Sequence, residues 1–252
     1  MSRAVAEPTV LDLFHASARA RDALRVRVGA ACFAVAALLE VIGLLFRGPL
    51  TSPARAPARF VQVSSSSTLH LSWELLLSAA MLQCFGWLAV YGWARASAEE
   101  RWAFRGMIFA IASLIVLLPV WGAFGLTSHE AALAETAGQH GAVALVGATA
   151  EGPVARKFLV VSVLAGLVAT GIWSRVFWRA GSSIRWIVPL MILHTISTSI
   201  TAPLFPPWGF RLERLGAFAF LIVGTVVALH IWRDEGAASA TVANRERSRG
   251  SG

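Results

Sequence analysis

The stretch "RVRVGAACFAVAALLEVIGLLF", residues 25–46, is apolar and long enough to cross a membrane as a helix. A transmembrane helix needs about 20 mostly apolar residues, because the hydrocarbon core is about 30 Å thick and each residue rises about 1.5 Å. Two arginines open the stretch, and Glu40 is the charged residue deeper inside it. The stretch therefore predicts a membrane-spanning helix that carries a carboxyl group.

The composition of the whole chain agrees with this prediction. Of the 252 residues, 56% are hydrophobic and 14% charged, and the mean hydropathy is +0.65. Soluble domains carry about a quarter of charged residues, so the chain has the composition of a membrane protein. Spans of alternating polarity, typical of membrane barrels, are absent from the sequence. The predicted fold is therefore an all-α, polytopic transmembrane bundle over residues 25–233, with six spans near 25–46, 71–94, 102–125, 157–178, 184–204 and 212–232.

The basic residues decide the predicted orientation. The net charge is +8, but the arginines stand at the ends of apolar segments and not on a soluble domain, so nucleic acid is not an expected partner. With both termini in the cytoplasm, roughly two thirds of the 22 basic residues face inward, as the positive-inside rule requires. The abundance of arginine and alanine is typical of GC-rich bacteria. We expect a bacterial inner-membrane protein whose partner is the lipid bilayer, with homo- or hetero-oligomers left open.

The two ends of the chain lie outside the predicted bundle. Residues 1–24 suit either a short amphipathic helix on the inner leaflet or a flexible tail, and both interpretations stay open. Residues 234–252 contain small and polar side chains without a core-forming set, so we expect a disordered cytoplasmic tail.

The outer loops carry their own local signals. Prolines and a serine run in residues 47–70 predict a loop without regular structure. In the second loop, Thr127 and Glu130 form a capping-box pattern, which predicts the start of a separate short helix. Eight tryptophans, Trp73 and Trp173 among them, fall near predicted span ends, as in the aromatic belts of membrane proteins.

Polar residues inside the spans are the candidate site, because ionisable groups in hydrocarbon are costly and usually functional. The fifth window contains "LHTISTSITAPLFPPWGF", residues 193–210, in which polar residues at i, i+3, i+4 and i+7 share one helical face. We expect this face to line an outward-facing polar cavity, with Glu40 and His194 as its ionisable centre at different depths. The predicted lining is Glu40, Glu74, Gln83, His194, Ser197, Thr198 and Thr201.

Structural roles for the same residues stay open. Serine and threonine hydroxyls in membrane helices often bond back to the carbonyl one turn earlier. His194 could make a structural hydrogen bond, and Glu40 could be a carboxyl bonded across to a neighbouring helix. Glu74 is near enough to a span end to reach the headgroups, and Glu213 has Arg211 and Arg214 as neighbours to pair with.

Four functions are compared on these residues. Small-molecule or ion handling through the polar cavity is the leading hypothesis, and an accessory or structural subunit without catalysis is its alternative. The small residues in "GLVATG", 166–171, would supply a packing face for such a subunit. A haem oxidoreductase is disfavoured because His70, His194 and His230 fall at different depths. A membrane hydrolase is disfavoured because H-E-x-x-H and G-x-S-x-G motifs are absent. No catalytic residue, cofactor or metal is expected.

The layout as a whole resembles the bacterial multi-pass membrane proteins grouped under domains of unknown function. An arginine-flanked first helix, a proline-rich outer loop and a last helix opening "RLERLGAFAFLIVG", residues 211–224, carry this resemblance. It implies a multi-pass membrane fold and no particular activity, so it transfers no functional residue.

Overall fold

The chain is helical throughout its described parts. The computed structural model describes residues 10–48, 51–181, 183–201 and 208–250, and the side chains at 21–48, 51–181, 183–199 and 210–234. No strand occurs within these residues, which confirms the predicted all-α class. The elements are α1 (Val10–Arg47), α2 (Pro57–Ser64), α3 (Ser67–Ala94), α4 (Glu100–Thr136), α5 (Ala142–Ala150), α6 (Pro153–Ala180), η1 (Arg185–Ile187), α7 (Val188–Ile196), η2 (Ser197–Thr201) and α9 (Trp208–Gly250).

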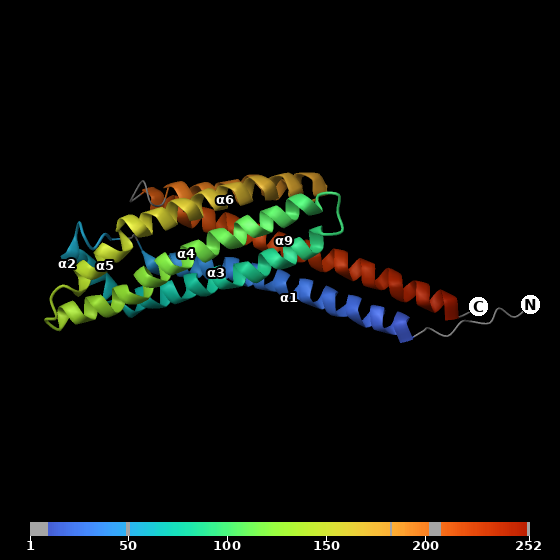
Figure 1. Cartoon of the computed structure of the whole chain (residues 1–252), viewed down its shortest axis with the longest axis horizontal. Coiled ribbons are helices and arrows are strands. Elements are labelled where there is room, and N and C mark those ends of the chain that lie inside the picture. The colour runs from blue at the N-terminus through green and yellow to red at the C-terminus, as the bar shows by residue number, and fades with distance from the viewer. Residues whose placement is uncertain (1–9, 49–50, 182, 202–207, 251–252) are drawn as a thin grey trace, which may run out of the picture.

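The long helices form a ring. Helix α1 packs against α3 and α9, α4 packs against α3 and α6, and α7 closes the ring between α6 and α9. The short helices α2 and α5 lie at one end of the bundle, and the start of α1 and the end of α9 lie at the other (Figure 1). Neighbouring long helices therefore run along a common axis, which is the arrangement of a membrane bundle.

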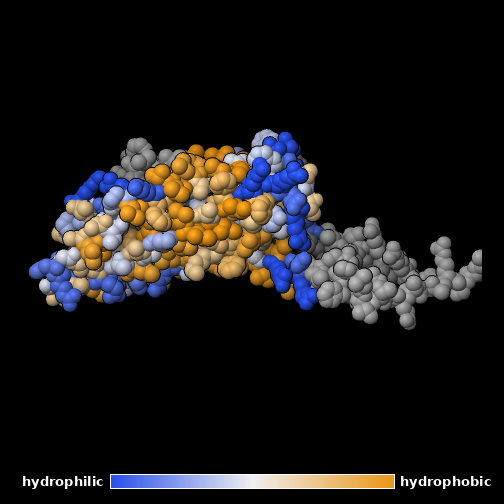
Figure 2. All heavy atoms as spheres, viewed as in Figure 1, coloured by the Kyte–Doolittle hydropathy of each residue, from blue (hydrophilic) through white to orange (hydrophobic). Residues whose placement is uncertain are grey.

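An apolar band surrounds the middle of the bundle. Five helical segments are long and apolar enough to cross a membrane: Arg21–Arg47, Ser67–Ala94, Glu100–Thr136, Pro153–Ala180 and Phe210–Asp234. On the face drawn in Figure 2, hydrophobic residues cover the middle of the bundle and hydrophilic ones gather on either side of them. Large apolar side chains such as Phe85, Ile115 and Leu164 are more than half exposed. A surface of this kind is suited to lipid tails, since water-facing apolar patches of this size are rare.

The segment predicted as the fifth span is shorter and less regular than the other five. It consists of η1, α7 and the π-helix η2, with three, nine and five residues. Residues 202–204 of the predicted window lie outside the described residues. The segment is thus not among the five helices that are long and apolar enough to cross a membrane. Pro189 in the first turn of α7 and the π-turns at its other end interrupt a uniform α-helix.

The centre of the bundle is an aromatic cluster. The Trp173 ring stacks on Trp87 and Phe177 with centroid distances of 5.2 and 5.5 Å. Phe33 of α1 meets Trp87 of α3 and Phe220 of α9 edge-on. Trp173 is fully buried, and Trp73 is 2% exposed. Both rings therefore belong to the interior, which corrects their prediction as members of the aromatic belt.

Small residues bring α1 and α3 into close contact. A Cβ atom added at Gly29 of α1 would lie 2.6 Å from the Ala89 Cβ of α3. A Cβ at Gly86 of α3 would overlap Cδ2 of Phe33 and lie 2.7 Å from its Cβ. Close approach of this kind is how membrane helices gain van der Waals contact without a hydrophobic driving force.

We expect Gly86→Ala to lower the stability of the bundle by about 1–3 kcal/mol, since the extra methyl group overpacks against buried Phe33. Thermal unfolding in detergent, followed by circular dichroism, measures the loss. Gly171→Ala is the matched control, because a Cβ there meets nothing within 4 Å. Equal melting temperatures for the two variants would show that the α1–α3 contact is looser than described.

Two predicted loops are more helical than expected. Residues 57–64 form α2, which begins at a proline and buries Phe60 against Ala131, Val143 and Val146. Helix α4 continues without a break to Thr136. The Thr127 hydroxyl donates to the Ala123 carbonyl one turn earlier, so it does not cap a new helix. The predicted capping box at Thr127 is wrong, because the same residue types also fit the interior of a continuing helix.

The first and last helices, α1 and α9, extend past the residues predicted as the bundle. Helix α1 begins at Val10 and runs unbroken into the first span. Residues 1–9 of the predicted N-terminal segment lie outside the described residues. Helix α9 runs on to Gly250, beyond residue 234, where the composition predicts a disordered tail.

The α3–α4 loop is tied to the end of α6 by Glu99. Arg175 Nε donates to one carboxylate oxygen at 2.9 Å, and Arg179 Nη1 donates to the other at 2.7 Å. The hydrogen bond from Arg175, and then that from Arg179, holds the pKa of the Glu99 carboxyl below its ordinary value. A folded-state pKa that is lowered adds stability above the ordinary carboxyl pKa, and that stability is lost as the pH falls through the folded value.

Glu99→Gln is therefore expected to destabilise the protein at pH 7 and to have less effect in acid. Melting temperatures of the wild type and the variant at pH 7 and pH 3 give the difference. Glu130→Gln, an exposed change near the opposite end of α4, controls for loss of a carboxylate. If the melting temperatures of the wild type and Glu99→Gln differ by the same amount at pH 7 and pH 3, the contacts of ionised Glu99 with the two arginines do not contribute to stability.

Candidate functional site

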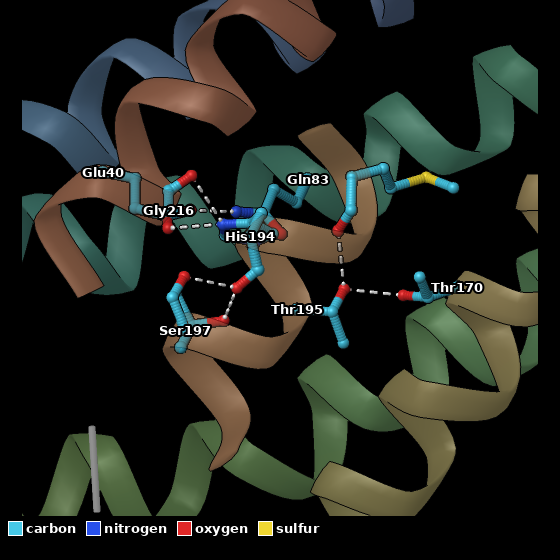
Figure 3. A network of polar contacts seen from close by, with 9 residues as sticks. Glu40, Gln83, Thr170, His194, Thr195, Ser197 and Gly216 are labelled. Atoms are coloured by element: carbon cyan, nitrogen blue, oxygen red, sulfur yellow. Dashed lines mark hydrogen bonds and ion pairs between the residues drawn. The ribbon is translucent and has the colours of Figure 1, made fainter. Parts of the chain in front are cut away.

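Three helices bring Glu40, Gln83 and His194 together inside the bundle (Figure 3). Gln83 Nε2 of α3 donates to Glu40 Oε2 of α1 at 2.9 Å. His194 Nδ1 of α7 lies 3.6 Å from Glu40 Oε1. The side chains of Glu40 and His194 are 11% and 17% exposed, so the contact is largely shielded. The carboxyl and the imidazole, expected at different depths, thus lie at the same level.

The position of Glu40 follows from the buried face of α1. Phe33, Ala36, Ala37, Val41 and Leu44 are buried on that helix, and Glu40 lies within their helical spacing. The carboxyl group consequently points into the bundle, where an amide and an imidazole are its polar neighbours. Gln83, at the middle of α3, is half-buried and supplies the amide.

Two oxygen atoms define the state of the His194 ring. Its Nδ1 lies 3.2 Å from the Gly216 carbonyl oxygen of α9, besides the 3.6 Å separation from Glu40. Because both neighbours are acceptors, Nδ1 carries the proton and donates to Gly216. The ring is held flat against Phe220 with a centroid distance of 4.4 Å. The imidazole is thus fixed in place next to a carboxyl group.

The hydroxyl groups of the same segment mostly bond within it. Ser197 and Thr198 both donate to the His194 carbonyl, at 2.9 and 2.7 Å. Thr195 donates to Met191 and meets the Thr170 hydroxyl of α6 at 2.7 Å. Figure 3 shows Thr195 on the side of the helix away from Glu40. The hydroxyls of Ser197, Thr198 and Thr195 thus bond back to carbonyl groups of the preceding turn, which is the structural role left open for them from the sequence.

A glycine allows α9 to approach the polar segment. A Cβ atom at Gly216 would overlap Ser197 Oγ and lie 3.3 Å from the His194 Cα. Any larger residue would therefore separate α9 from α7 and η2. Sequence reasoning missed this residue, although Gly216 stands in a run of apolar residues and invites the question of what it approaches.

The remaining predicted residues lie elsewhere. Glu74 is exposed on α3 and faces His70 Nε2 at 3.3 Å, so it does not join the Glu40 contact. The backbone of Thr201 ends the π-helix η2, and its side chain lies outside the described ones. The structure therefore brings together Glu40, Gln83, His194, Ser197 and Thr198 from the predicted set.

A buried ion pair joins α1 to α9. The sequence did not indicate this pair. Arg47 donates to Glu213, and both residues are at least 90% buried. The Arg47 guanidinium also lies 5.5 Å from the centre of the Trp73 ring. Arg214, one of the expected partners of Glu213, donates instead to the Leu44 and Leu45 carbonyls at the end of α1. Arg47 is seven residues from Glu40, about 10 Å along the helix.

A large groove lies at the end of the bundle formed by α2 and α5. Its volume is about 740 Å³, and its lining includes Pro57 of α2, Glu135 of α4 and Gly147 of α5. We name it the α2–α5 groove. None of the seven predicted residues lines it. The cavity and the ionisable contact are thus separate features.

His70, His194 and His230, the three histidines compared as haem ligands, lie on three different helices, α3, α7 and α9. His70, His194 and His230 each face a different carboxylate, at 3.3, 3.6 and 3.4 Å. Across the described residues, no group of three or more His, Cys, Asp or Glu side chains is placed to hold a metal ion.

Comparison with protein-family models, curated proteins and solved structures finds no match to this chain. The structure alone therefore indicates the class of protein. Five apolar helices long enough to cross a membrane, with large apolar side chains on their outer faces, are compatible with a multi-pass helical membrane protein.

Proposed function

We propose that this protein is a six-span bacterial inner-membrane protein that handles a small molecule or an ion with the help of a proton exchanged at Glu40. The observation that carries the proposal is the contact of Glu40 Oε1 with His194 Nδ1 at 3.6 Å inside the ring of helices. Carboxyl and imidazole groups within membrane helices are costly, and they typically mark proton or substrate pathways.

The irregular helix next to the contact supports this proposal. The π-helix η2 begins at Ser197, three residues after His194. Single π-turns are rare and occur frequently at functional sites, where they leave backbone groups for other partners. Here the Ser197 and Thr198 hydroxyls act as the other partners, because both donate to the His194 carbonyl oxygen. The segment that carries the imidazole is therefore built differently from the regular spans around it.

The sixth span and the orientation are part of the same proposal. The last turn of α6 contacts Glu99 in the α3–α4 loop. The first turns of α9 instead contact Arg47 at the end of α1, which lies at the other end of the bundle. The segment η1–α7–η2 leads from one end to the other, so we assign it as the sixth crossing. Trp232 donates to the Arg27 carbonyl, so the end of the apolar segment Phe210–Asp234 lies beside the start of the first one, Arg21–Arg47. An even number of crossings and the arginine-rich end favour both termini in the cytoplasm.

Proton flux through purified protein in liposomes tests the proposed function. A potassium gradient with valinomycin sets the membrane potential, and a trapped pH dye reports proton entry. We expect flux above that of empty liposomes for the wild type and at least about a tenfold loss for Glu40→Gln, because the amide keeps the size and loses the exchangeable proton.

Glu74→Gln is the matched control, because that carboxylate is exposed on α3 and lies outside the contact. It should leave the flux unchanged, and circular dichroism melts should show all three proteins folded. Wild-type flux equal to that of empty liposomes, or equal to that of Glu40→Gln, would end this proposal.

The accessory-subunit alternative loses its main sequence support. A Cβ at Gly166 would lie 3.2 Å from Ser113 Oγ of α4, and Thr170 bonds Thr195 of α7. The small-residue face of "GLVATG" is thus used within the chain, so it does not supply a free surface for a partner helix.

A further inference from the structure

One exposed face of α6 leads from the apolar band to the basic end of the bundle. Val161, Leu164 and Val168 are exposed on this helix, and large outward-facing apolar side chains suit lipid tails. Arg175 and Trp178 lie further along the same helical face. Hydrophilic residues border the hydrophobic band where the end of α6 meets the α3–α4 loop (Figure 1, Figure 2). A lipid whose tails lie along this face therefore has its headgroup near Arg175 and Trp178.

Ring contacts join arginines from α4, α6 and η1 at this place. Arg105 of α4 and Arg175 of α6 lie on the same ring, with their Cζ atoms 5.2 and 4.6 Å from the centre of Trp102. The Cζ atom of Arg185 in η1 lies 5.8 Å from the centre of the Trp178 ring. We name these five residues the α4–α6 patch: Trp102, Arg105, Arg175, Trp178 and Arg185.

The arginines of the α4–α6 patch keep donors for an external acceptor. Arg175 donates to Glu99 through Nε, and its side chain is still 40% exposed. Among the described side chains, Arg105 and Arg185 form ring contacts but no ion pair, and both are exposed. A guanidinium group carries five donors in a planar fork that matches the oxygens of a phosphate. A phosphate group that reaches the patch from outside is therefore a suitable acceptor.

The charges at this end of the bundle favour an anion. Five arginines and two carboxylates lie on or beside the α4–α6 patch: Arg101, Arg105, Arg175, Arg179, Arg185, Glu99 and Glu100. Asp22 and Asp234, two other described carboxylates at this end, are paired with Arg95 and His230. The balance is positive, so the patch attracts an anionic headgroup and repels the cationic part of a zwitterionic one.

We propose that the α4–α6 patch binds the phosphate of an anionic phospholipid whose acyl chains lie along the exposed face of α6. Arg105, Arg175 and Arg185 donate to the phosphate oxygens. Trp102 and Trp178 lie at the level where aromatic rings of membrane proteins meet the headgroups. The site stands apart from the Glu40–His194 contact and does not depend on the proton exchange proposed there.

Binding of tritiated phosphatidylglycerol to the protein in uncharged maltoside micelles tests the site. The unlabelled competitors are phosphatidylglycerol, phosphatidylcholine and inorganic phosphate. We expect phosphatidylcholine to compete at least about fivefold more weakly than phosphatidylglycerol, since one arginine near an anionic lipid contributes about that factor. Inorganic phosphate should not compete at the same concentration, because it has no acyl chains for the apolar face. Equal competition by phosphatidylcholine or by phosphate would overturn the proposal.

Two double variants locate the binding. Arg105→Gln/Arg185→Gln should weaken phosphatidylglycerol at least about tenfold and leave the Glu99 contacts in place. Arg55→Gln/Arg156→Gln removes the same charge from exposed positions at the α2–α5 end and should bind like the wild type. Circular dichroism melts should show both variants folded. Glu40→Gln should also bind like the wild type, which separates this test from the flux assay. Wild-type affinity in Arg105→Gln/Arg185→Gln, or an equal loss in the control, would overturn the proposal.

Discussion

Replacing Arg47 by methionine is expected to destabilise the folded bundle by about 3–5 kcal/mol, because the change leaves Glu213 buried without its counter-ion. The Arg47 and Glu213 side chains are 2% and 8% exposed, so water cannot replace the missing partner. The variant also loses the stacking of the guanidinium on Trp73 and Phe210. Unfolding in a graded sodium dodecyl sulfate series gives the free-energy difference.

The double variant Arg47→Met/Glu213→Leu separates the ion pair from general damage. Two apolar residues in place of a buried pair are often neutral, so most of the lost stability should return. Asp22→Asn provides the exposed counterpart, because Asp22 and Arg25 are 45% and 80% exposed. Exposed pairs contribute about 0–1 kcal/mol, so this change should have a small effect. A double variant less stable than Arg47→Met would refute the uncompensated-charge explanation.

Trp173→Ala is the second change with a large expected effect. The ring is fully buried and stacks on Trp87 and Phe177, so its loss leaves a cavity at the centre of the bundle. Buried Trp→Ala changes cost about 3–5 kcal/mol in soluble proteins. An unfolded state that stays in lipid lacks the water-transfer contribution, so we expect a loss of about 3 kcal/mol. Sodium dodecyl sulfate unfolding measures this change as well.

Trp178→Ala is the control for Trp173, five residues along the same helix. Trp178 is 57% exposed, so its removal should have little effect on unfolding. Trp173→Phe should fall between the two, because Trp173 Nε1 has no hydrogen-bond partner to lose. If Trp173→Ala and Trp178→Ala unfold alike, the aromatic cluster is not the centre of stability.

The membrane-bundle fold could be predicted because hydropathy and length are local properties. Each of the five helices long and apolar enough to cross a membrane overlaps a window predicted from its run of apolar residues. The depth of a residue follows from the same count. The direction in which it faces does not: Trp73 is buried and its neighbour Glu74 is exposed, although both lie at one depth.

The pairings across the bundle could not be predicted, because they depend on how helices rotate and pack. Glu213 has Arg211 and Arg214 beside it in sequence, yet it pairs with Arg47 on α1. Glu40 and His194 were predicted as the ionisable centre of one cavity, but at different depths and without their contact. Gly216 lets α9 approach the His194 segment, and a glycine in an apolar run does not reveal its neighbour.

Lipid exposure of the apolar band is the central claim, and spin labels in liposomes test it most directly. In a background with Cys32 and Cys84 replaced by alanine, single cysteines at Phe85, Ile115 and Leu164 carry the label. Labels at Glu130 and Arg179 mark the two hydrophilic ends. We predict that oxygen, which dissolves in lipid, relaxes the first three labels more strongly than a water-soluble nickel complex does, with the reverse order at the ends. Nickel access to the band equal to that at the ends would contradict the account.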